Sequence, residues 1–355
     1  MATIYDVAKR AGVSPKTVSR VLNDDAPVNA NTRKAVKTAM GELGYVPSRA
    51  ARSMRSNKTG LIGLITGAIT TNAESPETAG LPDLIIVQGI RATLAEAGFT
   101  LLIADTGEDP DNVPALMSTF AQHRVEGLFY VADRHSRIDL PRPPGEAELL
   151  LVNCFDEQGT PSVLPDDTAG QRGLVQRLIA AGHRRIGFLT LPDDLIAHGL
   201  RLAGYRAALE DAGIAYDGDL VIAAGLHHAS PRETMLMGEA VDRMMALDDP
   251  PTVLCCGNDR MAMQLYGVLR TRGIAVPGDI SVAGYDDHRL ISETLYPPLT
   301  TAVLPYREMG ERAAQWLIGR LRPETQAPDG PDITAPVRGP IVWRQSVIEH
   351  RNDQP

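Results

Sequence analysis

The residues from Ser14 to Asn23 carry side chains that are typical of protein–DNA contacts. Val18, Val21 and Leu22 recur at helical spacing. The positions around them hold small, polar or basic residues: Pro15, Lys16, Thr17, Ser19 and Arg20. Lysine and arginine can donate hydrogen bonds to base edges in the major groove. We therefore interpret the outward side of this stretch as a candidate DNA-reading surface, with Lys16 and Arg20 for base contact.

Further polar residues near the expected helix ends are placed for contact with the phosphate backbone. They are Thr3, Ser14, Thr17, Ser19, Asn23 and Asn29. Contacts of this kind position a protein on DNA without reading its sequence. Pro15 limits how the first turn of the helix approaches the bases. Taken alone, the stretch could also be an ordinary helical hairpin on the surface of a globular protein.

A second group of polar residues follows the apolar runs that we expect to be β-strands. This group comprises Asp105, Asn153, Asn258, Asp259, Asp286 and Asp287. Ligands of open parallel sheets bind beyond the carboxyl ends of the strands, and Arg201, which begins a helical stretch, could reach the same place. Carboxylates, carboxamides and a guanidinium present paired donors and acceptors that suit the vicinal hydroxyls of a sugar.

Each Asp and Asn of this second group could instead cap a helix or form a turn. We favour that structural role for Asp259 and Asp287. For Arg201 and Asp286 we favour contact with a ligand. Both roles stay open for Asn258.

Three short helices are expected to position the first group. Thr3, with Asp6 three residues later, forms a capping pattern. Gly12 supplies the backbone freedom of a sharp turn, and Ser14 before a proline marks the start of the next helix. A third helix is expected over residues 32–43. Its apolar face comprises Ala35, Val36, Ala39, Met40 and Leu43.

The charge of the chain is divided unevenly. Residues 1–58 hold eleven Lys and Arg against four Asp and Glu, a balance of +7, whereas the whole chain of 355 residues carries −9. The remainder therefore carries −16. A basic head has the sign needed to neutralise phosphates and release counterions. Because an acidic remainder would be repelled by DNA, the charge pattern confines the expected DNA contact to the head.

From Leu61 onward, short apolar runs alternate with helical stretches. Strands are expected at residues 61–66, 100–104, 127–131, 149–153, 185–189, 220–223, 252–255 and 281–283. Helices are expected at residues 86–97, 114–123, 169–181, 200–212, 233–247, 261–272 and 308–321. This alternation is typical of parallel sheets, and so many strands favour two doubly wound lobes. The helix at 308–321 is expected to return to the first lobe, and residues 341–347 to complete the second.

Several short motifs in the head form a recognisable set. They are Tyr5-Asp6-Val7-Ala8, Ala11-Gly12-Val13-Ser14, Thr17-Val18-Ser19-Arg20-Val21-Leu22-Asn23, Thr32-Arg33 and Leu43-Gly44-Tyr45-Val46-Pro47. Together they resemble the head of the LacI-type (lactose repressor) family of bacterial transcription factors. The resemblance implies a homodimer that binds a palindromic operator. It also implies a hinge helix over residues 49–55 that forms on DNA, with Met54 wedged into the minor groove.

Motifs in the rest of the chain resemble the periplasmic sugar-binding-protein fold, which forms the core of the same family. They are Ile62-Gly63-Leu64, Gly182-His183-Arg184-Arg185-Ile186, Arg201 with Gly204-Tyr205, Gly257-Asn258-Asp259-Arg260-Met261-Ala262, the run from Val276 to Asp287, and Pro298-Leu299-Thr300-Thr301. The resemblance places these residues where the family contacts its effector: Asn153, Arg201, Asn258, Asp286 and, for stacking on a sugar, Tyr306. Residues 70–83 are longer than the usual connection, and residues 323–339 are rich in proline and glycine.

Other classes of protein find little support in the sequence. The spacing of Gly60, Gly63 and Gly67 does not fit a dinucleotide-binding fingerprint, and no P-loop, nucleophile elbow or H-E-x-x-H motif occurs. Three cysteines, Cys154, Cys255 and Cys256, sit in apolar runs without metal-ligand spacing, so we expect them to be buried. No cofactor or metal is expected. Without a membrane-spanning run or an export signal, the expected location is the cytoplasm, at the nucleoid.

The sequence therefore predicts a helix-turn-helix head at residues 1–46, a hinge at 47–58 and an α/β core at 59–355. The first lobe is expected at about 60–156 and 303–323, and the second at about 157–301 and 324–349. The predicted function is a non-enzymatic repressor of genes for sugar uptake or metabolism, which a sugar effector releases from its operator. The alternatives are an effector that acts as co-repressor, a solute-binding protein and a sugar-modifying enzyme.

Overall fold

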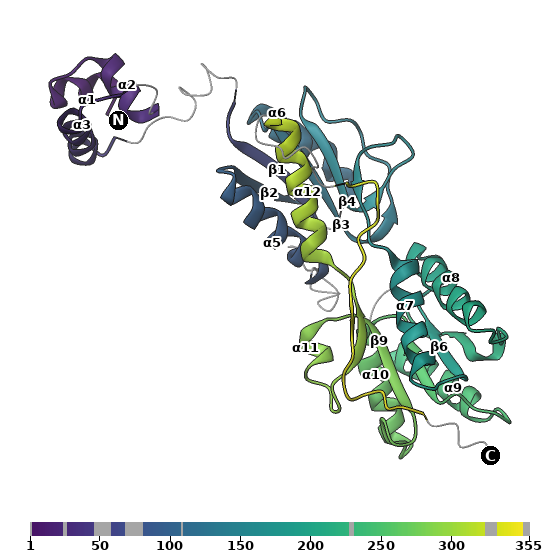
Figure 1. Ribbon diagram of the computed structural model, residues 1–355. Helices are drawn as coiled ribbons and strands as arrows, with labels where there is room; N and C mark the ends of the chain where they lie inside the picture. The colour runs from purple at the N-terminus through teal and green to yellow at the C-terminus, as the bar shows by residue number, and fades with distance from the viewer. Residues whose placement is uncertain are drawn as a thin grey trace. The chain divides into compact units, whose positions relative to one another are not determined.

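The computed structural model describes residues 2–23, 27–45, 58–67, 81–107, 109–226, 231–323 and 332–350. The chain forms two compact units that divide at Gly60. The first unit is a three-helix head, and the second contains two lobes, each built on a largely parallel sheet (Figure 1). The predicted fold class, a helical head followed by an α/β core of two doubly wound lobes, is confirmed.

The head packs three helices around a small apolar core. They are α1 (Ile4–Ala11), α2 (Pro15–Asn23) and α3 (Ala30–Leu43). The buried residues of the core are Val7, Ala8, Val18, Val21, Val36 and Ala39. The predicted apolar face of α3 is wrong at Ala35 and Leu43, which are exposed. So small a head covers only a narrow stripe of α3, and that stripe runs through Val36 and Ala39.

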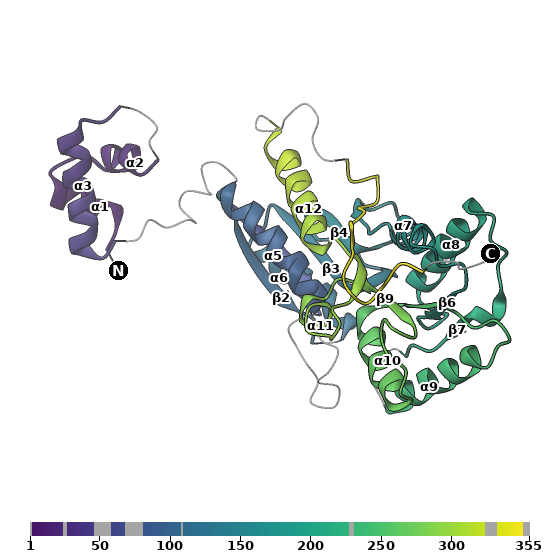
Figure 2. The same cartoon turned by 60° about the horizontal axis from the view of Figure 1, so that its bottom comes forward.

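The first lobe has a five-stranded parallel sheet in the order β2-β1-β3-β4-β5. Its strands are β1 (Leu61–Thr66), β2 (Thr100–Asp105), β3 (Gly127–Arg137), β4 (Glu148–Phe155) and β5 (Ser162–Val163). One face is covered by α5 (Leu81–Glu96) and α12 (Tyr306–Leu321), which lie side by side in Figures 1 and 2, and the other by α6 (Val113–Gln122). The predicted return of residues 308–321 to the first lobe is confirmed, because Met309, Ala313 and Leu317 belong to its core.

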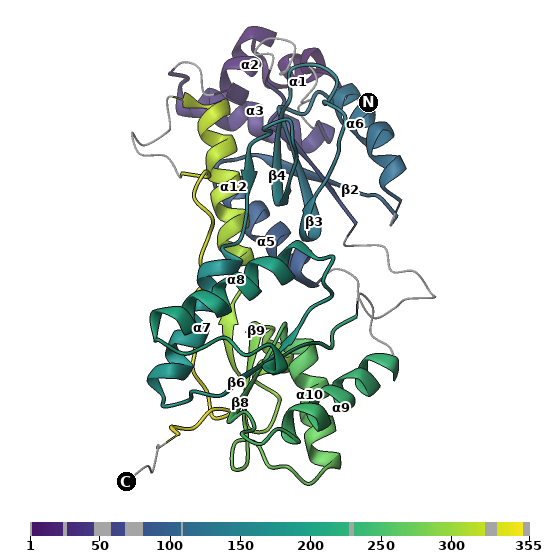
Figure 3. The same cartoon turned by 90° about the vertical axis from the view of Figure 1, so that its right-hand side faces the viewer.

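The second lobe has a six-stranded sheet in the order β11-β10-β9-β8-β6-β7. Its strands are β6 (Ile186–Thr190), β7 (Val221–Ala223), β8 (Val253–Cys256), β9 (Ser281–Asp286), β10 (Thr300–Val303) and β11 (Ile341–Val342). Only β11 runs antiparallel to its neighbour within the described part of this sheet. One face carries α7 (Asp167–Ala180) and α8 (Ile196–Asp211), and the other α9 (Pro231–Met245) and α10 (Asp259–Thr271), as Figure 3 shows. A short helix, α11 (Arg289–Ser292), follows β9.

The structure differs from the expected division between the lobes at two places. β5 pairs with β4, and Val163 lies in the core of the first lobe. Ile333 and Val337 also pack in that core, although residues 324–349 were expected in the second lobe. The chain thus passes between the two cores near residues 164–166, 304–306 and 338–340. Segments as short as β5 and β11 carry too few residues for a periodic pattern, so their partners depend on the tertiary fold.

Cys154, Cys255 and Cys256 are free thiols with fully buried side chains, as predicted. None of the helices that the structure describes is long and apolar enough to cross a membrane.

Candidate functional site

The predicted orientation of α2 is confirmed. Val18 and Val21 point into the core of the head, whereas Lys16 and Arg20 are exposed. Pro15, Thr17 and Ser19 are partly exposed on the same helix. A helix with a buried apolar side and an exposed basic and polar side is suited to insertion into a major groove.

Three of the polar residues predicted to contact phosphates lie at helix N-termini: Thr3, Ser14 and Asn29. Thr3 Oγ1 accepts a hydrogen bond from the backbone N–H of Asp6 (3.3 Å), and the Asp6 carboxylate accepts from the backbone N–H of Thr3 (2.8 Å), which completes a capping box. Ser14 Oγ accepts from the backbone N–H of Thr17 (3.2 Å). Asn29 Oδ1 accepts from the backbone N–H two residues later (2.9 Å). Because helix N-termini attract anions, these capping residues lie at positions that favour contact with a DNA phosphate.

Two parts of the predicted DNA-binding set fall outside the described residues. They are the side chain of Asn23 and the hinge over residues 49–55, which includes Met54. Residues 70–80 of the long connection are also outside them. Tyr5, which is 71% exposed on α1, is not among the predicted DNA-contacting residues. Its position off the stripe of Val7 and Ala8 is the signal that could have identified it as a surface aromatic.

In the second lobe, Arg201 is held among polar and aromatic groups at the carboxyl ends of the strands. The residue is only 4% exposed, and its Nε donates a hydrogen bond to Oδ1 of Asp167 (2.8 Å). Its Nη1 donates to the carbonyl oxygen of Gly257 and lies 3.9 Å from Oδ1 of Asp286. The guanidinium carbon is 3.8 Å from the centroid of the Tyr285 ring. A buried guanidinium needs such partners, because an unpaired buried charge is costly.

The carboxyl groups around Arg201 differ in the direction of their pKa shifts. Burial raises the pKa of Asp286 from its ordinary value of 3.8 to about 7, although Arg201 opposes the shift. Burial and the neighbouring Asp286 also raise the pKa of Asp259. Burial disfavours the charged form of Asp167, but the charge of Arg201 and hydrogen bonds outweigh it, so the pKa of Asp167 is lowered. The cluster therefore combines a firm ion pair with one carboxyl group that titrates near neutral pH.

The backbone at Asp286 and Asp287 is unusual. Asp286 has a φ of 122° and Asp287 a φ of 53°, a region that residues other than glycine rarely adopt. Asp287 accepts hydrogen bonds from Ser292 Oγ (2.8 Å) and pairs with Arg344 Nη2 (2.8 Å). The structural role predicted for Asp287 is therefore confirmed. Strained backbone of this kind is often retained at ligand-binding positions, and here it sets the direction of Asp286.

The two residues at the start of α10 have different environments. Asn258 is the N-cap, and its Oδ1 accepts a hydrogen bond from the backbone N–H of Met261 (2.8 Å). The cap leaves the Nδ2 amide of Asn258 as the group that could donate to a ligand. Asp259 is fully buried and accepts from Thr301 Oγ1 (2.7 Å) and from the backbone N–H of His288 (2.8 Å). The structural role predicted for Asp259 is confirmed.

The remaining predicted effector residues belong to the first lobe or to the boundary between the lobes. Asn153 is 1% exposed with a φ of 63°, and its Nδ2 donates to the carbonyl of Ala132 (3.1 Å). Asp105 Oδ1 accepts from the backbone N–H of Gly107 (2.8 Å) in a local turn. Tyr306 packs against the cores of both lobes. The described contacts thus bring Arg201 and Asp286 together, next to Asn258, and give Asn153 and Asp105 partners within the first lobe.

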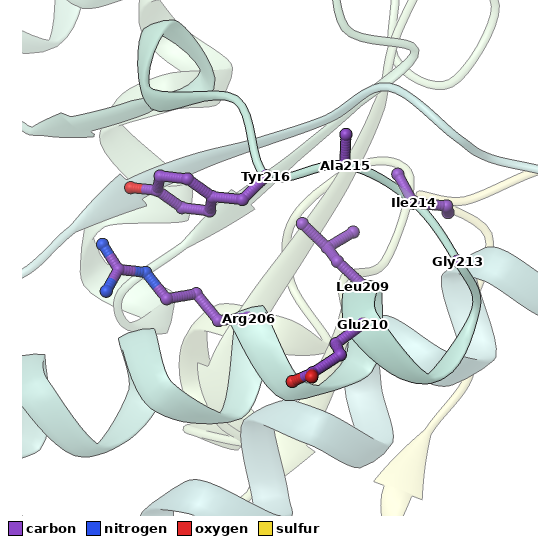
Figure 4. Close-up of a pocket in the computed structure, with 7 residues that line it drawn as sticks. All are labelled: Arg206, Leu209, Glu210, Gly213, Ile214, Ala215 and Tyr216. Atoms are coloured by element: carbon purple, nitrogen blue, oxygen red, sulfur yellow. The ribbon is translucent and has the colours of Figure 1, made fainter.

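A shallow pocket of about 710 Å³ lies elsewhere on the second lobe, between the end of α8 and the residues that follow it (Figure 4). There the guanidinium of Arg206 stacks on the ring of Tyr216 at 4.4 Å from its centroid. None of the predicted effector residues lines this pocket. The candidate site therefore rests on the chemistry at the strand ends and not on the size of a cavity. Within the described ranges, no group of three or more His, Cys, Asp or Glu side chains could hold a metal ion.

Comparison with known proteins gives consistent matches along the chain. Residues 3–48 match the lacI family of bacterial regulatory proteins, and residues 175–347 match a periplasmic binding protein-like domain. The HTH-type transcriptional regulator CelR of Thermobifida fusca is 36% identical over 332 residues, which cover 92% of this chain and 94% of CelR.

Two solved structures extend the similarity to three dimensions. A complex of the regulator CelR with cellobiose is 32% identical, with a TM-score of 0.61, and the alignment covers 98% of this chain and 100% of that one. The lac repressor dimer bound to operator and the anti-inducer ONPF is 26% identical, with a TM-score of 0.72, over 98% of this chain and 99% of that one.

Proposed function

The chain belongs to the lacI family of bacterial regulatory proteins, and from this we propose that it is a homodimeric transcriptional repressor that a sugar releases from a palindromic operator. One observation carries the proposal. A basic three-helix head and a polar cluster around Arg201 and Asp286, at the strand ends of a two-lobed unit, occur in the same chain. The head supplies the contact with DNA, and the cluster supplies the contact with the effector.

On DNA, α2 would enter the major groove with Lys16 and Arg20 at the base edges. Polar residues on and next to the helices of the head would contact phosphates: Thr3, Ser14, Thr17, Ser19, Asn23 and Asn29. Met54 in the hinge would wedge into the minor groove, where apolar side chains can kink the duplex. A dimer would read two inverted half-sites, one with each head. Binding to a chromosomal operator would place the protein in the cytoplasm, at the nucleoid.

A sugar is the effector class that best fits the cluster. Arg201 and the Nδ2 of Asn258 can donate hydrogen bonds, and the carboxyl group of Asp286 can accept or donate one, depending on its protonation. Asn153, Asp105 and Tyr306 would complete the site from the first lobe. The complex of the related CelR with cellobiose supports a saccharide ligand. We assign no catalytic step to these residues, since the named relatives are regulators.

Exposed apolar side chains support the homodimer. Tyr296 is 94% exposed and Leu290 in α11 is 71% exposed. Leu84 in α5 and Ile103 in β2, an edge strand, are also exposed. Figure 1 shows α5, β2 and α11 along the same side of the second unit. The exposed apolar side chains of these elements are candidates for an interaction surface. A second copy of the chain is the partner that two operator half-sites require.

The test is a thermal-shift screen with cellobiose, sucrose and ribose, followed by operator binding with any sugar that binds. A ligand that binds the folded chain raises the Tm. At a ligand concentration of 100 Kd, binding adds about 2.7 kcal/mol to the free energy of unfolding. A sugar that raises the Tm and weakens operator binding supports the proposed inducer. A sugar that strengthens operator binding shows the opposite polarity, that of a co-repressor. If no sugar changes the Tm or the operator affinity, the sugar effector is contradicted.

A further inference from the structure

A hydrogen bond joins the two lobes next to the proposed effector site. His135 belongs to β3 of the first lobe, and its Nδ1 lies 3.0 Å from Oδ2 of Asp167, the first residue of α7 in the second lobe. The side chain of His135 is 8% exposed and that of Asp167 is fully buried. Because an ionised carboxylate only accepts hydrogen bonds, the Nδ1 of His135 carries a proton and donates it.

The second half of β3 carries His135 to this position. The register between β3 and β4 shifts between Val131 and Ser136, so β3 leaves its regular pairing just before the histidine. Irregularities of this kind redirect side chains at the ends of strands. The imidazole also meets the ring of Phe155 edge-on, with the centroids 5.9 Å apart. The ring is therefore oriented from one side by an aromatic contact and from the other by the carboxylate.

The two carboxylate oxygens of Asp167 accept hydrogen bonds from residues of different lobes. Oδ1 accepts from Nε of Arg201 at 2.8 Å, while Oδ2 accepts from His135. Arg201 in turn lies 3.9 Å from Asp286. The result is a continuous chain of polar contacts from the first lobe to the proposed effector residues. Since Asp167, Arg201 and Asp286 all belong to the second lobe, the contact of His135 is the link in this chain that depends on how the lobes are placed.

We propose that His135 is a positioning residue that couples the placement of the two lobes to the arginine that binds the effector. In this arrangement, the hydrogen bond from His135 fixes the orientation of the Asp167 carboxylate, and Asp167 in turn fixes the guanidinium of Arg201. When the lobes shift, Asp167 loses one of its two partners and holds Arg201 less firmly. This inference rests on the proposed function, because it takes Arg201 as an effector-binding residue.

Three variants separate this role from a merely structural one. His135→Ala removes the donor, whereas His135→Asn keeps an N–H donor close to the position of Nδ1. His123→Ala removes an exposed histidine at the end of α6 in the same lobe and serves as the matched control. The three substitutions are made in the full-length chain.

Two measurements are made on each variant. Spin labels on Ser118→Cys in α6 and Glu239→Cys in α9, both exposed positions, report the distance between the lobes without any ligand. Labelling is selective because the native thiols are buried. The labelled chain is diluted into excess unlabelled chain, so that only distances within one chain are recorded. Calorimetry then measures the affinity for cellobiose, sucrose and ribose.

We expect His135→Ala to broaden the distance distribution and to weaken sugar binding about tenfold, which is the loss of roughly one hydrogen bond to a charged group. His135→Asn should restore both properties, and His123→Ala should change neither. An unchanged distance distribution in His135→Ala overturns the proposal. A broadened distribution with unchanged sugar affinity overturns the coupling to Arg201. If the original protein binds none of the sugars while its distances respond as expected, the sugar effector fails and the link between the lobes is supported.

Discussion

At the scale of a single residue, substitution of Arg20 tests whether this side chain contacts DNA bases. Arg20 lies in the last turn of α2 with an exposed side chain. We expect Arg20→Ala to weaken binding to the cognate palindrome by about 1–3 kcal/mol, because a guanidinium at a guanine edge contributes that much discrimination. Band-shift titrations at one fixed salt concentration, on the palindrome and on a random duplex, measure the specificity ratio.

Lys37→Ala is the control for this measurement. Lys37 is an exposed cation on α3, outside the reading helix. Its removal should change the affinities for both duplexes alike, as expected for a charge that acts on phosphates. An Arg20→Ala variant that lost the same affinity on both duplexes would show that Arg20 does not contact bases.

Asp286 should give the folded protein a distinctive pH dependence. The pKa of its carboxyl group is raised from 3.8 to about 7 by burial, so between these values the folded chain holds a proton that the unfolded chain releases. The stabilisation of the folded state by this proton is fully present below about pH 4 and is lost as the pH rises through 7. Asp286→Asn removes this titration. Calorimetry should therefore show the Tm of the variant rising relative to that of the original protein between pH 5 and pH 8; parallel profiles would contradict the shifted pKa.

The same residue tests the effector site. Asp286→Ala should leave operator affinity within about twofold and abolish the response to the sugar, whereas Asp248→Ala, at an exposed loop position, should leave both unchanged. Band shifts with and without sugar measure both properties. Loss of operator binding with an intact response would contradict the site. Arg201→Ala is a poorer test, because it breaks a buried ion pair and leaves Asp167 with only the hydrogen bond from His135, at a cost of about 3–5 kcal/mol of stability.

At the scale of elements, the packing of α12 on α5 depends on a close approach of two helices. A Cβ on Gly310 of α12 would overlap the backbone carbonyl of Ile86 in α5. We expect Gly310→Ala to lower the free energy of unfolding by about 1–3 kcal/mol or more, since the crowded atoms are backbone and cannot move aside easily. Urea unfolding of the full-length chain measures the change.

Gly267→Ala is the matched control within a helix. Gly267 lies in α10, and a Cβ there would meet nothing within 4 Å. Alanine is the better helix former, so this variant should gain about 0.5–1 kcal/mol. Similar losses in both variants would show that the approach of α12 to α5 is not the cause.

At the scale of the whole molecule, the exposed apolar side chains of α5, β2 and α11 should hold two chains together. Leu290→Asp places a charge at one of these positions and should convert the protein into monomers. Operator affinity should then fall by about a hundredfold or more, since each head binds its half-site independently. Sedimentation equilibrium and band shifts measure the two effects.

Tyr216→Asp is the control for the dimer. Tyr216 is an exposed aromatic next to α8, away from α5, β2 and α11. This variant should remain dimeric with unchanged operator affinity. A Leu290→Asp protein that stayed dimeric would place the interface elsewhere.

The sequence alone determined the features that depend on neighbours within a few residues. The capping box of Thr3 and Asp6, the left-handed turn at Gly12 and the start of α2 after Ser14 all rest on contacts of four residues or fewer. The direction of α2 and the parallel strands follow from periodic apolar patterns in the same way. Such local signals predicted the fold class and the exposed side of α2.

Only the tertiary structure decided which polar residues meet. Asp166 and Asp167 are adjacent and equally plausible as helix caps, yet Asp166 caps α7 while Asp167 reaches Arg201, 34 residues away. The rotation of α7, set by its packing on the sheet and on α8, makes that choice. His135 reaches Asp167 from the other lobe for a similar reason, through a register shift that no local pattern encodes. Long-range contacts between buried charges depend on the packed fold, because only packing brings distant residues within hydrogen-bond distance.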